Sequence, residues 1–256
     1  MAMELFSLSG RTALVTGASS GLGRRFALVL AQAGASVALA ARRQERLDKA
    51  AAEIAKSGGR VVAVAMDVTD AKSIAAGFAA AEAALGVVTV LVNNAGIAAS
   101  GSALETSAAE WDRVMDVNLK GAFFVATEAA RRMVGAKKTG TIVNIASIAG
   151  IGVAGGIAPY AASKAGLDHL TRTLAQEWAR HGIRVNALAP GYFATDLNRE
   201  FLASEAGAAI KKRIPMRRFG EAGDLDGALL LLASEAGRFM TGSTVVVDGG
   251  HLASSL

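Results

Sequence analysis

The chain has 256 residues, of which 52% are hydrophobic and 19% are charged, so its composition excludes a disordered protein and allows one large α/β domain. It contains no cysteine, which excludes disulfides and thiolate chemistry, and we predict no metal site. The net charge is +5 but only 5% of residues are aromatic, so we expect a solvated basic surface or attraction to an anionic ligand, and no nucleic-acid binding.

The longest apolar runs, such as residues 228–233, are far shorter than the roughly 18 residues that a membrane-spanning helix needs. The first nine residues carry Glu4 and no basic stretch of the kind that begins a signal peptide. We therefore expect a cytoplasmic protein without a membrane partner.

Short apolar segments rich in β-branched residues alternate with amphipathic segments along the whole chain. In chain order, the predicted strands are residues 13–16, 37–41, 61–66, 88–92, 140–145, 184–189 and 244–247. The predicted helices are residues 22–32, 44–56, 71–85, 108–134, 160–180 and 224–234. This alternation predicts a single-domain α/β Rossmann fold over residues 1–256, with a doubly wound seven-stranded parallel sheet and helices on both faces. Residues 192–219 lack a strand pattern, and we expect a helical flap there over the ligand cleft.

A glycine-rich turn, residues 16–23, follows the first predicted strand and opens the first predicted helix. Its spacing is Gly-x-x-x-Gly-x-Gly. Glycines in this place let a pyrophosphate approach the positive end of a helix, although glycines also simply make tight turns. The position at the first strand-to-helix crossing favours a dinucleotide site, and its candidate residues are Gly17, Ser19, Ser20, Gly21, Leu22 and Gly23.

The end of the second predicted strand indicates which dinucleotide binds. An NAD site usually has a carboxylate about 20 residues past the glycines, which binds the ribose 2′-hydroxyl. Here Arg42 and Arg43 occupy that region, and the next carboxylate is Glu45. Because arginine pairs bidentately with phosphate, we predict NADP(H) rather than NAD(H), with Arg42 at the 2′-phosphate. Asp67 either accepts a hydrogen bond from adenine or caps the next turn, for which Asp70 is the better helix cap.

Tyr160 and Lys164 are four residues apart at the start of a predicted helix, and therefore share one face. A free tyrosine has a pKa near 10, but a neighbouring ammonium and an oxidised nicotinamide favour the phenolate. Ser147 follows a predicted strand and can hydrogen-bond a substrate oxygen. Each residue alone has an ordinary structural explanation, but together they indicate proton transfer at a carbonyl.

With these motifs the chain resembles the short-chain dehydrogenase/reductases over essentially its whole length, and the motif pattern is most similar to 3-oxoacyl-[acyl-carrier-protein] reductases. The motifs that carry the resemblance are the turn at residues 16–23, Asn-Asn-Ala-Gly at 93–96, the set Asn118, Ser147, Tyr160 and Lys164, Pro190-Gly191 with Thr195, and Asp-Gly-Gly at 248–250.

The resemblance implies a role for each member of the catalytic set. Tyr160 would donate the proton to the carbonyl as the nicotinamide delivers hydride, and Ser147 would hold the carbonyl oxygen. Lys164 would bind the nicotinamide ribose and lower the pKa of Tyr160. Asn118 would hold a water that returns the proton through Lys164.

The resemblance also implies cofactor contacts and an assembly. Asp67 and Val68 would lie at the adenine, and residues 183–186 on the nicotinamide side. Around the adenosine ribose and the nicotinamide, the implied contacts are Asn93, Asn94, Ala95, Gly96, Tyr160, Lys164, Pro190, Gly191 and Thr195. The family commonly forms homotetramers through the long helices, here residues 108–134 and 160–180, and the C-terminal strand region.

The substrate is the open question. Apolar residues in the loops expected to line the pocket (Ile148, Ile151, Val153, Ile157, Tyr192 and Phe193) favour a 3-oxoacyl thioester carried on CoA or acyl carrier protein. The resemblance to 3-oxoacyl-[acyl-carrier-protein] reductases implies carrier contacts near Lys138 and His181. A basic cluster at residues 211–218 either contacts a phosphate of CoA or carrier protein or forms a solvated helix face. The alternative is a ketone or alcohol dehydrogenase acting on a sugar, a steroid or another small secondary alcohol. A non-catalytic NADP sensor is a third hypothesis, which the intact catalytic set argues against.

Overall fold

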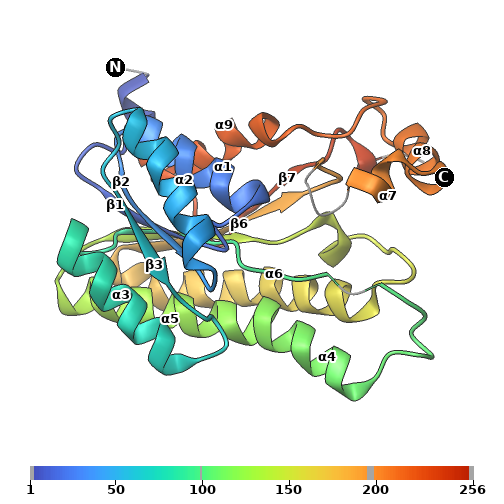
Figure 1. The fold of residues 1–256 in the computed structure, drawn as a ribbon, viewed down its shortest axis with the longest axis horizontal. Coiled ribbons are helices and arrows are strands. Elements are labelled where there is room, and N and C mark those ends of the chain that lie inside the picture. Colours follow the sequence, from blue (N-terminus) through green and yellow to red (C-terminus); the bar gives the residue numbers. More distant parts are fainter. Residues whose placement is uncertain (1–2, 99, 195–198, 254–256) are drawn as a thin grey trace.

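A computed structural model describes residues 3–98, 100–194 and 199–253. Seven strands form one parallel sheet in the order β3-β2-β1-β4-β5-β6-β7 (Figure 1). The strands are β1 Thr12–Thr16, β2 Ser36–Ala41, β3 Val61–Ala65, β4 Val90–Asn93, β5 Gly140–Ile145, β6 Ile183–Pro190 and β7 Thr244–Val247. Strand order turns outward in both directions from β1 and β4, so the predicted doubly wound Rossmann fold is confirmed.

Helices cover both faces of the sheet. They are α1 Gly21–Gln32, α2 Gln44–Lys56, α3 Ala71–Leu85, α4 Ala108–Met115, α5 Ala122–Gly135, α6 Ala158–Trp178, α7 Arg199–Ala203, α8 Glu205–Arg213 and α9 Asp226–Ala233. Figure 1 shows α1, α2 and α9 on one face and α3, α5 and α6 on the other. Within the described part of the chain, no helix is both long and apolar enough to cross a membrane.

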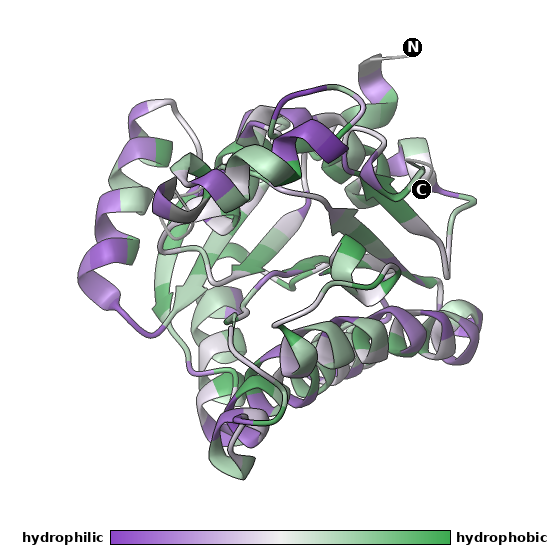
Figure 2. Cartoon of the chain, turned by 90° about the vertical axis from the view of Figure 1, so that its right-hand side faces the viewer, coloured by the Kyte–Doolittle hydropathy of each residue, from purple (hydrophilic) through white to green (hydrophobic). Residues whose placement is uncertain are grey.

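The alternation of side chains along the strands builds two hydrophobic cores. In β1, Val15 packs toward α1 and α9, whereas Leu14 packs toward α3, α5 and α6. Phe26 of α1 and Phe78 of α3 are fully buried, one in each core. In Figure 2 the strands carry mainly apolar residues and the outer helix surfaces mainly polar ones. Burial on both faces explains why the strands are apolar throughout.

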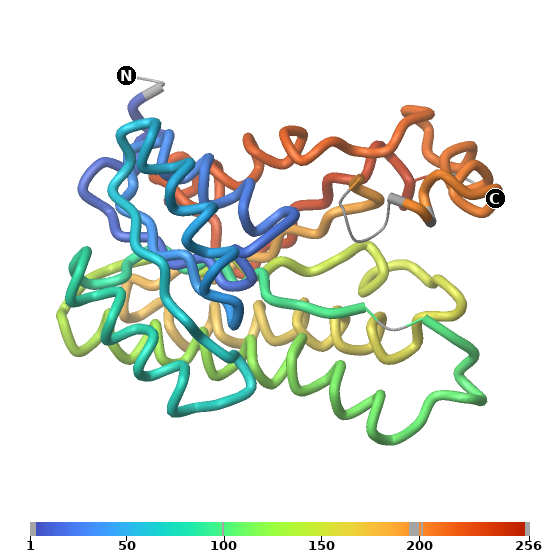
Figure 3. The backbone as a smooth tube through the Cα atoms, viewed as in Figure 1, coloured from blue at the N-terminus to red at the C-terminus, as the bar shows by residue number. Residues whose placement is uncertain are grey.

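One predicted helix is divided in the structure, and the segment predicted to be helical after β6 contains two short helices. The predicted helix at residues 108–134 is interrupted by a π-helical turn, Asp116–Gly121, between α4 and α5. The segment predicted as a flap contains α7 and α8, and Phe193 pairs with Gly220 in an isolated parallel bridge at its base. Figure 3 shows this segment at the same end of the molecule as the C-terminal turn.

Candidate functional site

The glycine-rich turn is tightly packed where β1 gives way to α1. Gly17 and Gly21 have positive φ angles of 67° and 55°, a region that side chains disfavour. A Cβ atom on Gly23 would lie 2.5 Å from the Gly17 carbonyl oxygen and 2.5 Å from Asn94 Nδ2. The turn therefore tolerates only glycine at residue 23.

Thr16 joins this turn to the end of β4. Its Oγ1 accepts hydrogen bonds from the backbone N–H groups of Asn94 and Ala95, both at 2.9 Å. Asn94 Nδ2 donates to the Thr16 carbonyl oxygen at 2.9 Å. These bonds hold the predicted pyrophosphate and ribose segments side by side. Ser19, Ser20 and Leu22 are half-buried on the same turn, and no side-chain cap bond from Ser20 to α1 is present in the described structure.

Asn93 differs from its neighbours, because its side chain is buried. Its Nδ2 donates to the Ala122 carbonyl oxygen at 2.7 Å and to Asn144 Oδ1 at 3.2 Å. Any contact of Asn93 with a ribose would have to come from its main chain.

Residues 183–186 also differ from expectation, since they begin β6 and lie at the end of the strand opposite Pro190 and Gly191. The implied nicotinamide contact at residues 183–186 was therefore wrong.

The residues expected at the adenine end gather beyond β2 and β3. Arg42 and Arg43 are exposed after β2. Hydrogen bonds from the backbone N–H and hydroxyl of Thr69 lower the pKa of Asp67, and the charge of Arg42 acts in the same direction. Asp67 thus caps its own turn while lying within electrostatic range of Arg42. Asp70 caps α3 by accepting from the Lys72 N–H, as predicted.

Val68 packs against the π-helical turn, because a Cβ on Gly121 would lie 2.7 Å from its carbonyl oxygen. At the other end of the cleft, Pro190 ends β6, and a Cβ on Gly191 would lie 2.8 Å from Asp248 Cα. Thr195 lies outside the described residues.

The structure brings Ser147, Tyr160 and Lys164 together at the carboxyl end of β5. Ser147 follows this strand and accepts a hydrogen bond from the Ala149 N–H at 3.1 Å. Lys164 is 4% exposed, and its Nζ donates to the Ile145 carbonyl oxygen at 2.7 Å. The same nitrogen lies 5.8 Å from the centre of the Tyr160 ring. A Cβ on Gly96 would lie 3.6 Å from Lys164 Nζ, so the β4 loop closes over the lysine.

The protonation of Tyr160 and Lys164 is set mainly by burial. Burial raises the pKa of Tyr160, and a hydrogen bond with Ser147 partly opposes this. Burial lowers the pKa of Lys164 to about 8. The expected lowering of the Tyr160 pKa by Lys164 is absent from the described structure, because Nζ is directed at the Ile145 carbonyl. Positive charge from a bound nicotinamide or a movement of Nζ is needed to produce it.

Burial of Lys164 predicts that stability depends on pH. Its pKa falls from 10.5 to about 8 in the folded protein, so the unfolded chain binds more protons between these two pH values. The free energy of unfolding should therefore rise between pH 8 and 9.5, by up to about 2 kcal/mol at roughly 1.4 kcal/mol per unit. Urea titrations at several pH values measure this rise, and Lys164→Met should remove it. An identical rise in the variant would contradict the assignment to Lys164.

Asn118 is fully buried in the π-helical turn and links two segments. Its Oδ1 accepts from the Ile97 N–H at 2.8 Å. Its Nδ2 donates to the Ile97 carbonyl oxygen at 2.9 Å and to Ser163 Oγ at 3.1 Å. Both amide protons are therefore used within the protein. A water held by Asn118, as the resemblance implies, would best be bound by its main chain.

Ser163 is a site residue that sequence reasoning missed. It is fully buried, accepts from Asn118 Nδ2, and donates to the Tyr160 carbonyl oxygen at 2.7 Å. It thereby ties the first turn of α6 to the π-helical turn. The signal was a serine placed directly before Lys164, in a helix where serine commonly bonds back to an earlier carbonyl.

We expect Ser163→Ala to lower kcat about five- to tenfold, because one buried hydrogen bond of roughly 1 kcal/mol no longer orients the Tyr160 turn. Steady-state kinetics across pH measure this effect, which should come with a shifted pH profile. Ser163→Thr keeps the hydroxyl and should restore most of the activity. Equal losses in the alanine and threonine variants would point to packing rather than to hydrogen bonding.

Comparisons with known proteins show which family this chain resembles. The model of a family described as enoyl-(acyl carrier protein) reductase matches residues 17–251. Gluconate 5-dehydrogenase of Gluconobacter oxydans is 42% identical over 96% of this chain and 96% of its own. Galactitol 2-dehydrogenase (L-tagatose-forming) of Cereibacter sphaeroides is 43% identical over 96% and 97%.

Among solved structures, a gluconate 5-dehydrogenase from Burkholderia cenocepacia, in complex with NADP and tartrate, superimposes with a TM-score of 0.95. It is 38% identical and covers all of both chains. Because the family model and these relatives match the chain nearly from end to end, the protein belongs to the short-chain dehydrogenase/reductase family.

Proposed function

We propose that the protein is an NADP(H)-dependent dehydrogenase that interconverts a secondary alcohol and a ketone on a sugar acid. The observation that carries the reaction type is the placement of Tyr160 and the buried Lys164 on one helical turn beside Ser147. The substrate class is supported by the relatives named gluconate 5-dehydrogenase, which favour the alternative of a sugar substrate over the 3-oxoacyl thioester.

The residues present fit an NADP(H) cofactor. Helix α1 begins at Gly21, and within the described residues its N-cap residue Ser20 makes no side-chain cap bond, which suits a pyrophosphate at the free backbone N–H groups. Arg42 is exposed beyond β2, where its guanidinium can pair with a 2′-phosphate. The Burkholderia structure, with NADP bound, supports the same choice. When bound, the nicotinamide supplies or accepts the hydride.

Side chains of the protein would carry out the proton transfer and hold the substrate in position. The Tyr160 hydroxyl donates a proton to the ketone oxygen during reduction and accepts one from the alcohol during oxidation. Ser147 would hold that oxygen through its hydroxyl, and Lys164 would bind the nicotinamide ribose. Asn118 and Ser163 keep the turn that carries Tyr160 and Lys164 in place. In the oxidation direction the phenolate form of Tyr160 is required, so the rate should rise with pH.

The surface gives little support for the carrier-bound alternative. Within the cluster at residues 211–218, Arg218 is paired with Asp224, and the Arg217 guanidinium bonds the Lys212 carbonyl. His181 accepts a hydrogen bond from Arg180 Nε at 3.2 Å. These partners reduce the charge and the donors left for a phosphate.

The experiment is to incubate purified protein with NADP⁺ and D-gluconate or galactitol, and with NADPH and acetoacetyl-CoA, and to follow absorbance at the nicotinamide band. NADPH formation from gluconate is the expected result. Consumption of NADPH with acetoacetyl-CoA alone would restore the thioester hypothesis. Turnover of galactitol without gluconate would move the substrate class to neutral polyols.

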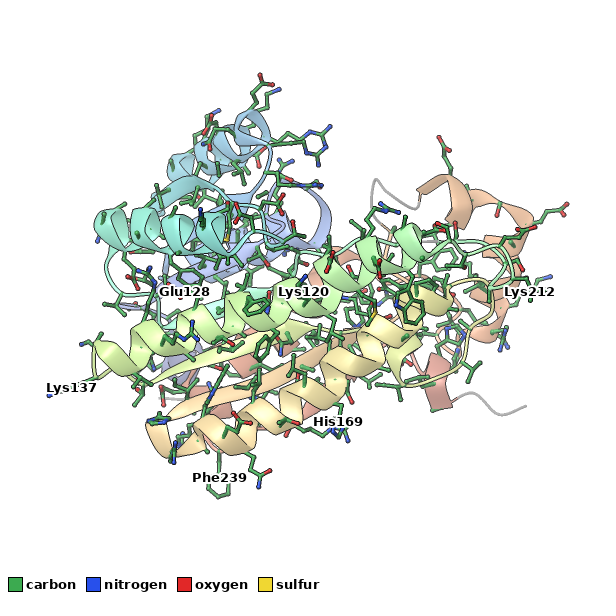
Figure 4. All side chains as sticks on the ribbon, turned by 90° about the horizontal axis from the view of Figure 1, so that it is seen from below. Lys120, Glu128, Lys137, His169, Lys212 and Phe239 are labelled. Carbon is green, nitrogen blue, oxygen red and sulfur yellow. The ribbon has the colours of Figure 1, made fainter. Side chains whose placement is uncertain are left out.

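We also propose that the protein is a homotetramer. Figure 4 shows α5 and α6 side by side, with Lys120 on the π-helical turn that precedes α5 and His169 on α6. Between them lies a groove of about 440 Å³ lined mainly by apolar side chains, among them Met115, Leu119 and Phe123. Burial of this groove against a second copy fits the interface that the resemblance implies. Sedimentation that shows a monomer at micromolar concentration would contradict it.

A further inference from the structure

The C-terminal turn that follows β7 holds a histidine in a defined position. Both carboxylate oxygens of Asp248 accept backbone hydrogen bonds inside this turn, from Gly250 at 2.8 Å and from Leu252 at 2.7 Å. His251 lies between these two residues and is half-buried. Because the Asp248 carboxylate bonds the backbone on both sides of His251, it holds the backbone that carries the imidazole.

The turn is packed against the segments that we expect to enclose the substrate. A Cβ on Gly191, at the end of β6, would lie 2.8 Å from Asp248 Cα. A Cβ on Gly152, in the loop that follows Ser147, would lie 2.6 Å from Leu252 Cδ2. A Cβ on Gly249 would lie 2.9 Å from Ile214 Cγ2, so the turn also packs against the residue that follows α8. The turn therefore forms part of the substrate end of the cleft, although it is distant in sequence from the catalytic set.

His251 also contacts an aromatic ring that adjoins the catalytic tyrosine. Its ring centre lies 5.6 Å from that of Tyr192, with the planes tilted by 35°. Tyr192 is in turn close enough to Tyr160 to interact with it electrostatically. Tyr192 therefore lies between Tyr160 and His251, and the imidazole is one ring away from the tyrosine that we expect to transfer the proton.

Polarity distinguishes His251 from the apolar residues in this part of the cleft. Ile148 and Phe193 are buried, and Ile151 is about half exposed. Their side chains offer a sugar acid no hydrogen bond. A sugar acid nevertheless has a carboxylate that must keep hydrogen bonds when it leaves water, because an unpaired buried charge is costly. The imidazole N–H is a donor of the required kind.

We propose that His251 is a specificity-determining residue whose imidazole donates a hydrogen bond to the carboxylate of the substrate. This carboxylate is at the end of the substrate away from its reacting carbon. Tyr192 supports the ring from one side, and the braced turn fixes its height in the cleft. The inference rests on the proposed sugar-acid function and adds to it the residue that recognises the acid.

Two substitutions of His251 separate its donor from its shape. His251→Phe keeps a ring against Tyr192 but removes the donor, whereas His251→Gln keeps a donor without the ring. Hydrogen bonds to charged groups contribute about 1.5–3 kcal/mol, so His251→Phe should raise KM for gluconate roughly 10- to 100-fold. We expect kcat to change less than about threefold and His251→Gln to retain part of the affinity. Equal KM values in wild type and His251→Phe would overturn the proposal.

A second measurement does not depend on turnover. The chain has three histidines, and His169 and His181 are exposed on and just beyond α6. In protein labelled on the histidine rings and saturated with NADP⁺, D-gluconate should shift the His251 resonance and leave the other two unchanged. The assignment comes from the spectrum of His251→Gln. Galactitol, which lacks a carboxylate, is the matched probe and should produce a smaller shift.

The two measurements also separate this inference from the proposed function. Turnover of gluconate with an unmoved His251 resonance would overturn the role of His251 and leave the function standing. A shifted resonance with a raised KM in His251→Phe would support both. If gluconate is neither turned over nor able to move the resonance, the sugar-acid function and the role of His251 fall together.

Discussion

Tyr160→Phe is expected to lower kcat by about 10²- to 10⁴-fold, the range typical for loss of a general acid or base. Only the hydroxyl is removed, so the ring still fills its place beside Lys164 and Ser147. Binding of NADPH should remain within about twofold of wild type. Steady-state kinetics measure the first quantity, and titration of nicotinamide fluorescence measures the second.

The chain offers a matched control, because its other tyrosine is Tyr192. Tyr192→Phe makes the same chemical change one ring away from the reaction. Its effect should be smaller than about tenfold and should fall mainly on KM, since Tyr192 positions His251 rather than moving a proton. Unchanged turnover in Tyr160→Phe would refute the proposed mechanism and revive the hypothesis of a non-catalytic NADP sensor.

Arg42→Ala is expected to raise KM for NADPH by about 10- to 100-fold, because charge-assisted hydrogen bonds contribute roughly 1.5–3 kcal/mol. KM for NADH should change less than about threefold, since NADH has no 2′-phosphate for the guanidinium to bind. The ratio of kcat/KM for the two cofactors is the quantity to measure, and it should fall toward one.

Arg43→Ala is the control for this experiment, because Arg43 is also exposed but precedes α2 at its N-cap. Its removal lowers the net charge equally, so any general electrostatic attraction of NADPH would weaken in both variants. A loss confined to Arg42→Ala supports a direct contact. Equal losses for NADPH and NADH in Arg42→Ala would show that the residue does not choose between the cofactors.

Most of the fold could be predicted because buried parallel strands leave a strong signal. Six of the seven strands begin within one residue of their predicted starts, and β4 begins at Val90 rather than at residue 88. Residues 88 and 89 extend the same apolar pattern, but Val88 bonds the Glu82 side chain and Thr89 bonds the Thr12 carbonyl before the ladder of β4 begins. A continuous hydrophobic run does not show where such pairing starts.

The π-helical turn at Asp116–Gly121 was beyond prediction for a different reason. Its sequence suits an ordinary helix, and the link that accompanies it is made by Asn118 to Ser163, 45 positions along the chain. A local sequence pattern does not predict a hydrogen-bond partner so far along the chain. The same limit hid Ser163 itself, whose position beside Tyr160 and Lys164 was visible but whose two hydrogen bonds were not.

The substrate prediction gave too much weight to apolar loop residues. Ile148 and Phe193 are 9% and 5% exposed, so much of their surface serves packing within the protein rather than contact with a ligand. The polar group that we assign to recognition, His251, is more than 90 residues away from Tyr160 in sequence. Only the fold brings the C-terminal turn beside Gly191.

The close packing of Gly23 against Gly17 and Asn94 has a consequence for how the protein can change. At 2.5 Å from neighbouring atoms, residue 23 has no room for a side chain, and backbone atoms rather than side chains shape this corner. The substrate end is instead formed by side chains on turns, such as His251. Directed evolution toward a new substrate should therefore accept substitutions around residue 251. Gly17 and Gly23 should stay unchanged, so that the cofactor part of the site is kept.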